Sequence, residues 1–181
     1  MADDKSKAGR QLGPTGETVR RNIRWIRDAR GISGAELSQA VDRLGRPIPL
    51  LGIQRIEAGT RRVDVDDLMA IAVALGVSPA SLLMPLRKDV PGSDRDSAVP
   101  RPGDEVQIKD LVSITGWHKD ITASWVWDWV TAAKPLVSGT MLAFIRHGLP
   151  SWERERAEAE MEAAIQKRNR EVHYGDVDGE G

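Results

Sequence analysis

The residue types that usually perform catalysis or bind metal are scarce in this sequence. It has no cysteine and three histidines, His118, His147 and His173, none at a metal-ligand spacing from another. No glycine-rich phosphate loop is present, and no nucleophile stands at a recognisable spacing from a base. A self-cleaving dyad of Ser124 and Lys134 would need a larger sheet domain than this chain offers. We therefore expect no catalytic residue, no metal site, no cofactor and no enzymatic activity.

Asp64, Asp66 and Asp67 form a cluster of carboxylates that could suggest metal binding or acid–base catalysis. A helix commonly begins with a capping aspartate followed by carboxylates in its first turn, because these groups satisfy or complement unpaired backbone N–H groups. We interpret the cluster as the start of a helix.

The side chains best suited to specific recognition lie between residues 50 and 62. Gln54 can pair with adenine, and Arg55 can pair with guanine or with a phosphate. Thr60, Arg61 and Arg62 follow as a short basic loop, of the kind that contacts a phosphate strand beside a helix in the groove. This chemistry points to nucleic acid.

Two short helices must position these groups. Ser33 and Glu36 have the spacing of a capping box, and Leu37, Ala40, Val41 and Leu44 give the following helix a buried side that ends at Gly45. The turn GRPIP then places Ile48 between the helices, and its prolines keep it from being helical.

The next helix begins near Pro49 or Leu50 and ends at Gly59. Within it, Ile53 and Ile56 face inward while Leu50, Leu51, Gln54 and Arg55 face largely outward.

Three more helices complete a small core. The first runs from Thr15 or Gly16 to Arg30, with Thr15 as its cap. Its apolar stripe leaves out Trp25, which covers a flank of the core or belongs to an interface. The other two begin at the Asp64 cap and at Ser78, where Pro79 takes the first helical position.

Residues 19–85 resemble the Cro/CI or Xre type of helix-turn-helix domain in the runs SGAELSQAV, IQRIEAG (53–59) and LMAIAVALGVSPASLL (68–83). The resemblance implies a five-helix, lambda-repressor-like fold that binds double-stranded DNA, commonly as a homodimer on palindromic sites. It also implies that Glu57 pairs with an arginine of the first helix, here Arg27. Gly34 stands where the family often has a glutamine, and the turn before the third helix is longer than usual. The residues expected to contact DNA are Ser33, Leu50, Leu51, Gln54, Arg55, Thr60, Arg61 and Arg62.

The charge distribution agrees with one DNA-binding half. Residues 1–90 carry 15 Lys or Arg against 11 Asp or Glu, and residues 91–181 carry 11 against 16, so a polyanion is attracted to the first half alone. The sequence shows neither a secretory signal nor an apolar run long enough to span a membrane. We expect a cytoplasmic, nucleoid-associated protein that does not enter a membrane.

The fold class we expect is mainly α, with a small antiparallel β region and C-terminal helices after the helix-turn-helix domain. Trp125, Trp127 and Trp129 would share one face of a strand over 121–130, and core or interface packing is favoured over a base-stacking platform. A short helix is expected at 138–147, with Met141, Phe144 and Ile145 inward.

The expected divisions of the chain are a flexible arm (1–14), the helix-turn-helix domain (15–87), a linker (88–104), a Trp-rich β/α domain (105–150), a charged helix (151–171) and a disordered acidic tail (172–181).

The function these features predict is that of a sequence-specific transcriptional regulator, with repression by occlusion as the default mechanism. The C-terminal part would mediate dimerisation or sense a small ligand. The alternative is an antitoxin-like or adaptor protein in which the Trp-rich region binds a protein partner.

Overall fold

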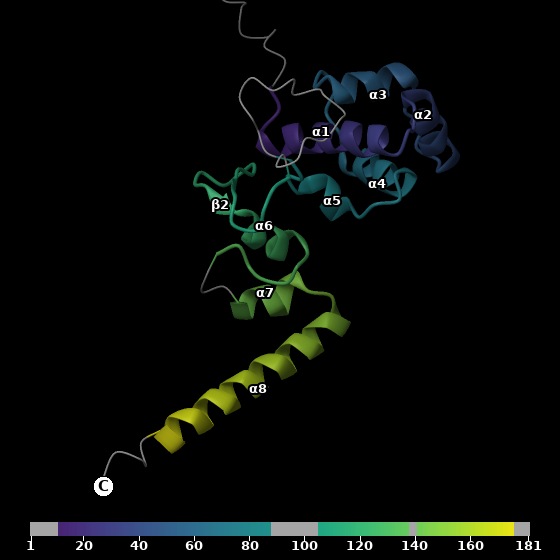
Figure 1. Cartoon of the computed structure of the whole chain (residues 1–181). Coiled ribbons are helices and arrows are strands. Elements are labelled where there is room, and N and C mark those ends of the chain that lie inside the picture. Colours follow the sequence, from purple (N-terminus) through teal and green to yellow (C-terminus); the bar gives the residue numbers. More distant parts are fainter. Residues whose placement is uncertain (1–10, 88–104, 138–140, 176–181) are drawn as a thin grey trace, which may run out of the picture. The chain divides into compact units, whose positions relative to one another are not determined.

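The computed structural model describes residues 11–87, 105–137 and 141–175. The expected arm before Gln11, the expected linker and residues 176–181 of the expected tail lie outside these ranges. The chain divides into two compact units, Met1–Val130 and Thr131–Gly181, and each is described by itself (Figure 1).

Helix α1 (Pro14–Ala29) has its N-cap two residues before the expected cap, Thr15. Gly13 is the N-cap residue and Pro14 takes the first helical position, where a missing backbone N–H costs nothing. The expectation that Thr15 caps this helix was therefore wrong. Thr15 instead exchanges two hydrogen bonds with Thr115, which donates its backbone N–H to Thr15 Oγ1 at 2.9 Å and accepts the Thr15 N–H at 3.2 Å.

The next four helices have the order and the starting residues expected from the sequence. They are α2 (Gly34–Arg43), α3 (Leu50–Glu57), α4 (Val65–Ala74) and α5 (Pro79–Leu83). The side chains of Ser33, Asp64 and Ser78 cap α2, α4 and α5. Gly31, Gly45, Gly59 and Gly76 follow the first four helices with positive φ, the left-handed conformation that ends helices.

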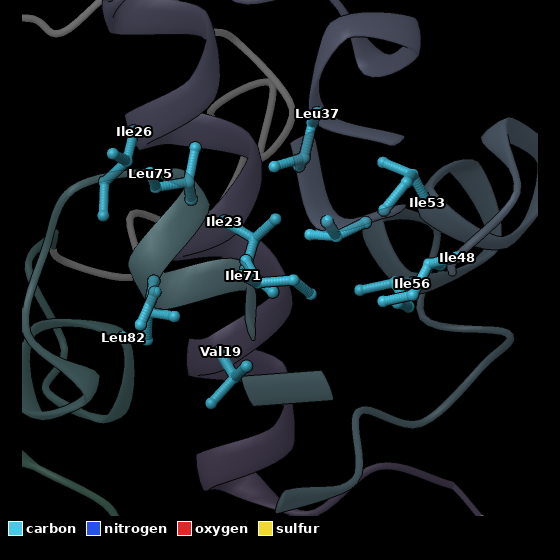
Figure 2. Packing of buried hydrophobic residues seen from close by; sticks show 12 residues of the cluster. Val19, Ile23, Ile26, Leu37, Ile48, Ile53, Ile56, Ile71, Leu75 and Leu82 are labelled. Carbon is cyan, nitrogen blue, oxygen red and sulfur yellow. The ribbon is translucent and has the colours of Figure 1, made fainter. Parts of the chain in front are cut away.

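One hydrophobic core joins these helices. Ile23 of α1 and Ile71 of α4 are fully buried near its centre, and Ile48 of the turn is also buried (Figure 2). Figure 1 shows α1 with α3 on one side and α5 on the other. Leu44, which we expected on the buried side of α2, is 49% exposed because it is the C-cap residue, beyond the last helical turn.

Residues 105–130 belong to the first unit. Strands β1 (Leu111–Val112) and β2 (Ile121–Thr122) form an antiparallel pair in which Leu111 is opposite Thr122 and Val112 is opposite Ile121. The Val106 backbone N–H donates to the Leu86 carbonyl at 3.1 Å and so ties this segment to the chain after α5.

Trp25 covers a flank of the core, which is the first of the two positions expected for it. Its ring packs against the hydrophobic cluster, and the Arg87 guanidinium carbon lies 5.9 Å from its centroid, within reach of a cation–π contact.

The expected strand over residues 121–130 was wrong beyond Thr122. Residues Ala123–Val130 form helix α6, with Ala123 and Val126 buried. A strand here would need a further hydrogen-bonding partner, and β1 is only two residues long, whereas a helix pairs its own backbone groups. Its first N–H groups reach the carbonyls of Asp110 and Ile108.

The three tryptophans of α6 therefore do not share one face. Trp125 and Trp129 are one helical turn apart, and Trp127 lies about 200° around the helix from Trp125. Their exposed fractions are 43% for Trp125 and Trp127 and 39% for Trp129, so none is a buried core residue.

The second unit contains α7 (Met141–Gly148) and α8 (Ser151–Gly175). Helix α8 continues to Gly175, beyond its expected end at residue 171. In α7, Ile145 is buried, but Met141, expected to face inward, is 41% exposed because it begins the helix. Trp152, in the first turn of α8, is 73% exposed.

Candidate nucleic-acid interface

The start of α2 is fixed by a reciprocal capping box. Ser33 Oγ accepts the Glu36 backbone N–H at 3.2 Å, and the Ser33 backbone N–H donates to the Glu36 carboxylate at 2.7 Å. This second bond lowers the pKa of Glu36, because it stabilises the charged carboxylate. Ser33, an expected DNA contact, is thus exposed at the first turn of α2 with its oxygen already used as a cap.

The turn between α2 and α3 is held by one side chain and one close packing contact. Ser38 Oγ donates to the Ile48 carbonyl at 2.7 Å, and Ile48 fills the core. A Cβ on Gly34 would lie 3.1 Å from Leu50 Cδ1. The glycine that replaces the usual glutamine therefore lets the start of α2 approach the start of α3.

Helix α3 presents a clear division between a buried and an exposed side. Ile53 and Ile56 are fully buried, whereas the side chains of Gln54 and Arg55 are exposed. Leu50 and Leu51 lie at the start of the helix, exposed at 41% and 55%. The structure thus brings the four expected base-reading residues onto the outward side of one short helix.

An ion pair fixes the end of α3 to α1. Arg27 Nε donates to Glu57 Oε1 at 2.7 Å and Nη2 donates to Oε2 at 3.0 Å, a bidentate pair with both side chains about nine-tenths buried. The hydrogen bonds to Glu57 raise the pKa of Arg27. The pair expected from the sequence resemblance is present, and it fixes α3 relative to α1.

The side chains of the basic loop after α3, Thr60 to Arg62, hydrogen-bond to other residues of the chain. Thr60 Oγ1 donates to the Arg55 carbonyl at 3.2 Å and so caps the end of α3. Arg61 Nη2 donates to Asp67 Oδ2 at 2.8 Å. Arg62 is exposed, and its Nη2 donates to the Gln11 carbonyl at 3.3 Å. Thr60 and Arg62 thus contact backbone carbonyls, whereas Arg61 has a structural role through an ion pair.

That role centres on Asp67, which the sequence pattern predicts to be one of two carboxylates in the first turn of α4. Its side chain is 1% exposed and accepts hydrogen bonds from Arg46 Nε and Arg61 Nη2, both at 2.8 Å. Arg46 also pairs with Asp64 at 2.5 Å. Asp67 thus joins the turn before α3, the loop after α3 and the start of α4.

A sequence signal for this network existed in Gly52. A Cβ there would lie 2.8 Å from Arg61 Nη1 and 3.0 Å from Ile48 Cγ2. Glycine is disfavoured inside a helix, so its presence in the middle of α3 indicates that something packs closely against the backbone. That neighbour is Arg61.

Comparison with known families agrees with this geometry. Residues 23–82 match a family described as helix-turn-helix. The matched region is a Cro/CI-type helix-turn-helix domain. It covers α2 to α4, the part of α1 from Ile23 onward and most of α5, so the domain is of a DNA-binding class found in transcription regulators. No curated protein and no solved structure matches the chain.

The residues that the structure describes also bear on metal binding and membrane insertion. Within residues 11–87, 105–137 and 141–175, no cluster of three or more histidine or acidic side chains is placed to hold a metal ion. Across the same ranges, none of the helices is both long and apolar enough to cross a membrane.

Proposed function

We propose that this protein is a sequence-specific transcriptional repressor that inserts α3 into the major groove and acts as a homodimer in the bacterial or phage-infected cytoplasm. The observation that carries the proposal is the outward side of α3, where Gln54 and Arg55 are exposed while Ile53 and Ile56 hold the helix to the core. A dimer would double this short contact set and place two α3 helices on two half-sites.

The roles of the contacts differ by chemistry. Gln54 and Arg55 can each make paired hydrogen bonds to a purine edge, which gives discrimination of about 1–3 kcal/mol per good pair. Leu50 and Leu51 can offer apolar contact to thymine methyl groups. Arg62 can contact a phosphate, which positions the protein without reading sequence.

The test is selection of bound DNA from a random library, followed by titration of the enriched site with variants. Gln54→Ala should weaken binding to that site by roughly 5- to 150-fold and relax the preference at one base pair. Arg62→Gln should weaken binding to every sequence and lower the salt slope by about 1. Gln39→Ala, on the exposed side of α2, is the control expected to change neither.

Repression itself needs a separate measurement. A reporter whose promoter overlaps the selected site should be expressed less when the protein is present, and Gln54→Ala should restore expression. Increased expression with the wild-type protein would assign activation instead.

A second candidate function, an adaptor or antitoxin-like protein, is favoured by the exposed Trp125 and Trp129 of α6. Exposed tryptophans are common at protein interfaces, because each buries a large area. In that case replacing both by alanine would abolish activity in cells while DNA affinity stays unchanged, and Gln54→Ala would leave activity intact.

A further inference from the structure

The second unit has too few buried side chains to be stable by its own packing. Among residues 131–137, 141–168 and Arg170, whose side chains the structure describes, the buried ones are those of Pro135 and Ile145. Phe144 and Met161 are half-buried. A segment of this size normally needs a larger core, a staple or another subunit.

Helix α8 extends well beyond the helix that packs against it. Helix α7 has 8 residues and α8 has 25, about 12 Å against about 37 Å at 1.5 Å per residue. Ala157 and Met161 are half-buried, and α7 is the neighbour that α8 contacts. Ala164 and Ile165 continue the same stripe in the next turn, and Ile165 is 45% exposed.

The charges of α8 are divided along its length. Residues 151–162 carry five glutamates and two arginines, a net −3. Residues 163–175 carry one lysine, two arginines and one glutamate, a net +2. Two copies of α8 placed side by side therefore attract each other only when they run antiparallel.

The helix dipole does not explain this division, because its effect is confined to the first and last turns. Glu153 lies in the first turn, but Glu158, Glu160 and Glu162 lie beyond it. Lys167 lies two turns before the end of the helix at Gly175. The arrangement is instead that of an antiparallel helix pair, in which opposite charges flank an apolar seam.

We propose that α8 packs antiparallel against α8 of a second copy of this chain, with Met161, Ala164 and Ile165 in the seam. This rests on the proposed function, for which it names the dimerisation surface. Each acidic first half lies beside the basic second half of the partner, and the α7–α8 pairs of two copies together supply the core that one copy lacks.

The first experiment measures the molecular mass of the full chain by sedimentation equilibrium. Ile165→Glu should raise the dimer dissociation constant at least about tenfold, because it places a charge in an apolar seam. Ala163→Glu is the matched control, since residue 163 lies about 200° around the helix from residue 165. Far-UV circular dichroism should show the same helix content for both.

The second experiment tests the charge pairing and the direction. Lys167→Glu with Arg168→Glu should weaken self-association, whereas Arg170→Glu, about 200° from residue 168, should not. Mixing the first variant with a Glu158→Lys and Glu160→Lys chain should restore a heterodimer. Because the chain has no cysteine, a Ser151→Cys variant reports direction: antiparallel helices keep the two cysteines apart, so no disulfide dimer forms.

Three results would overturn the proposal: a monomeric wild-type chain, a Ser151→Cys disulfide dimer, or dimer loss caused by Met69→Glu and not by Ile165→Glu. Met69 is 49% exposed on α4, between Val65 and Val73, and represents the competing apolar surface.

The proposed function is tested by different outcomes. A wild-type dimer with no selected DNA motif would refute DNA recognition, whereas a monomer that selects a half-site would refute the α8 pairing and the homodimer but leave DNA recognition by α3 standing.

Discussion

Replacing the buried Asp67 by asparagine should destabilise the first unit by about 3 kcal/mol. Each of the two charge-assisted hydrogen bonds that the carboxylate accepts contributes about 1.5–3 kcal/mol net in proteins. Arg46 and Arg61 keep 37% and 34% of their side chains exposed, so solvent screening places each contribution at the lower end of that range. In Asp67→Asn, one arginine faces an amide nitrogen that cannot accept its proton, and the other arginine loses the charge of its acceptor, so both contributions are lost or much reduced.

The assay is urea unfolding of the full chain followed by tryptophan fluorescence and circular dichroism. With a slope of about 1.5 kcal/mol per molar urea, a loss of 3 kcal/mol lowers the midpoint by about 2 M. Asp66→Asn is the matched control, because Asp66 is 81% exposed and lies 3.9 Å from Arg46; it should change stability by less than about 0.5 kcal/mol. Equal effects of the two substitutions would refute the role given to Asp67.

Three further predictions follow from the same packing. Glu57→Ala should lower the free energy of unfolding in urea by about 2 kcal/mol, because it removes the pair that fixes α3 to α1. It should also lower DNA affinity, because α3 is then misplaced. Full DNA affinity at low temperature together with unchanged stability would contradict this. Gly52→Ala should destabilise α3 rather than give the gain of about 0.5–1 kcal/mol usual for this change inside a helix, because the new Cβ meets Arg61 and Ile48; a raised urea midpoint would show that the neighbours move freely. The hydrogen bond from the Asp67 backbone N–H, and then the Arg46 charge, lower the pKa of Asp64. Its carboxylate therefore stabilises the fold above about pH 4, and this contribution is lost as the pH falls through the lowered pKa. Between about pH 7 and pH 3, Asp64→Asn should thus lose less unfolding free energy than the wild type.

The helical fold of the first unit could be predicted because local signals and packing agree there. Ser33 and Glu36 mark a helix start, and Gly31 and Gly59 mark helix ends. Ile23 and Ile26 in α1, like Ile53 and Ile56 in α3, stand three residues apart, at helical spacing. Each of these features depends on residues a few positions apart, which a sequence displays directly.

The features that sequence reasoning missed depend on contacts between distant residues. The clamp of Arg46 and Arg61 on Asp67 joins positions up to 21 residues apart, and charge patterns alone do not distinguish it from a solvated helix start. The alternation of Trp125, Trp127 and Trp129 fits a strand, but a strand requires a partner, and whether one exists is not visible in the segment itself. The Thr15 and Thr115 contact likewise became visible only in the structure.

The most direct test of the central claim is selection from a random DNA library with the purified full chain, carried out in parallel with the Gln54→Ala variant. We predict that the wild type enriches a palindromic motif and that the variant loses preference at one position in each half-site. If the wild type binds DNA only in a salt-sensitive way and enriches no motif, the outward side of α3 does not read sequence and the proposed repressor function is wrong.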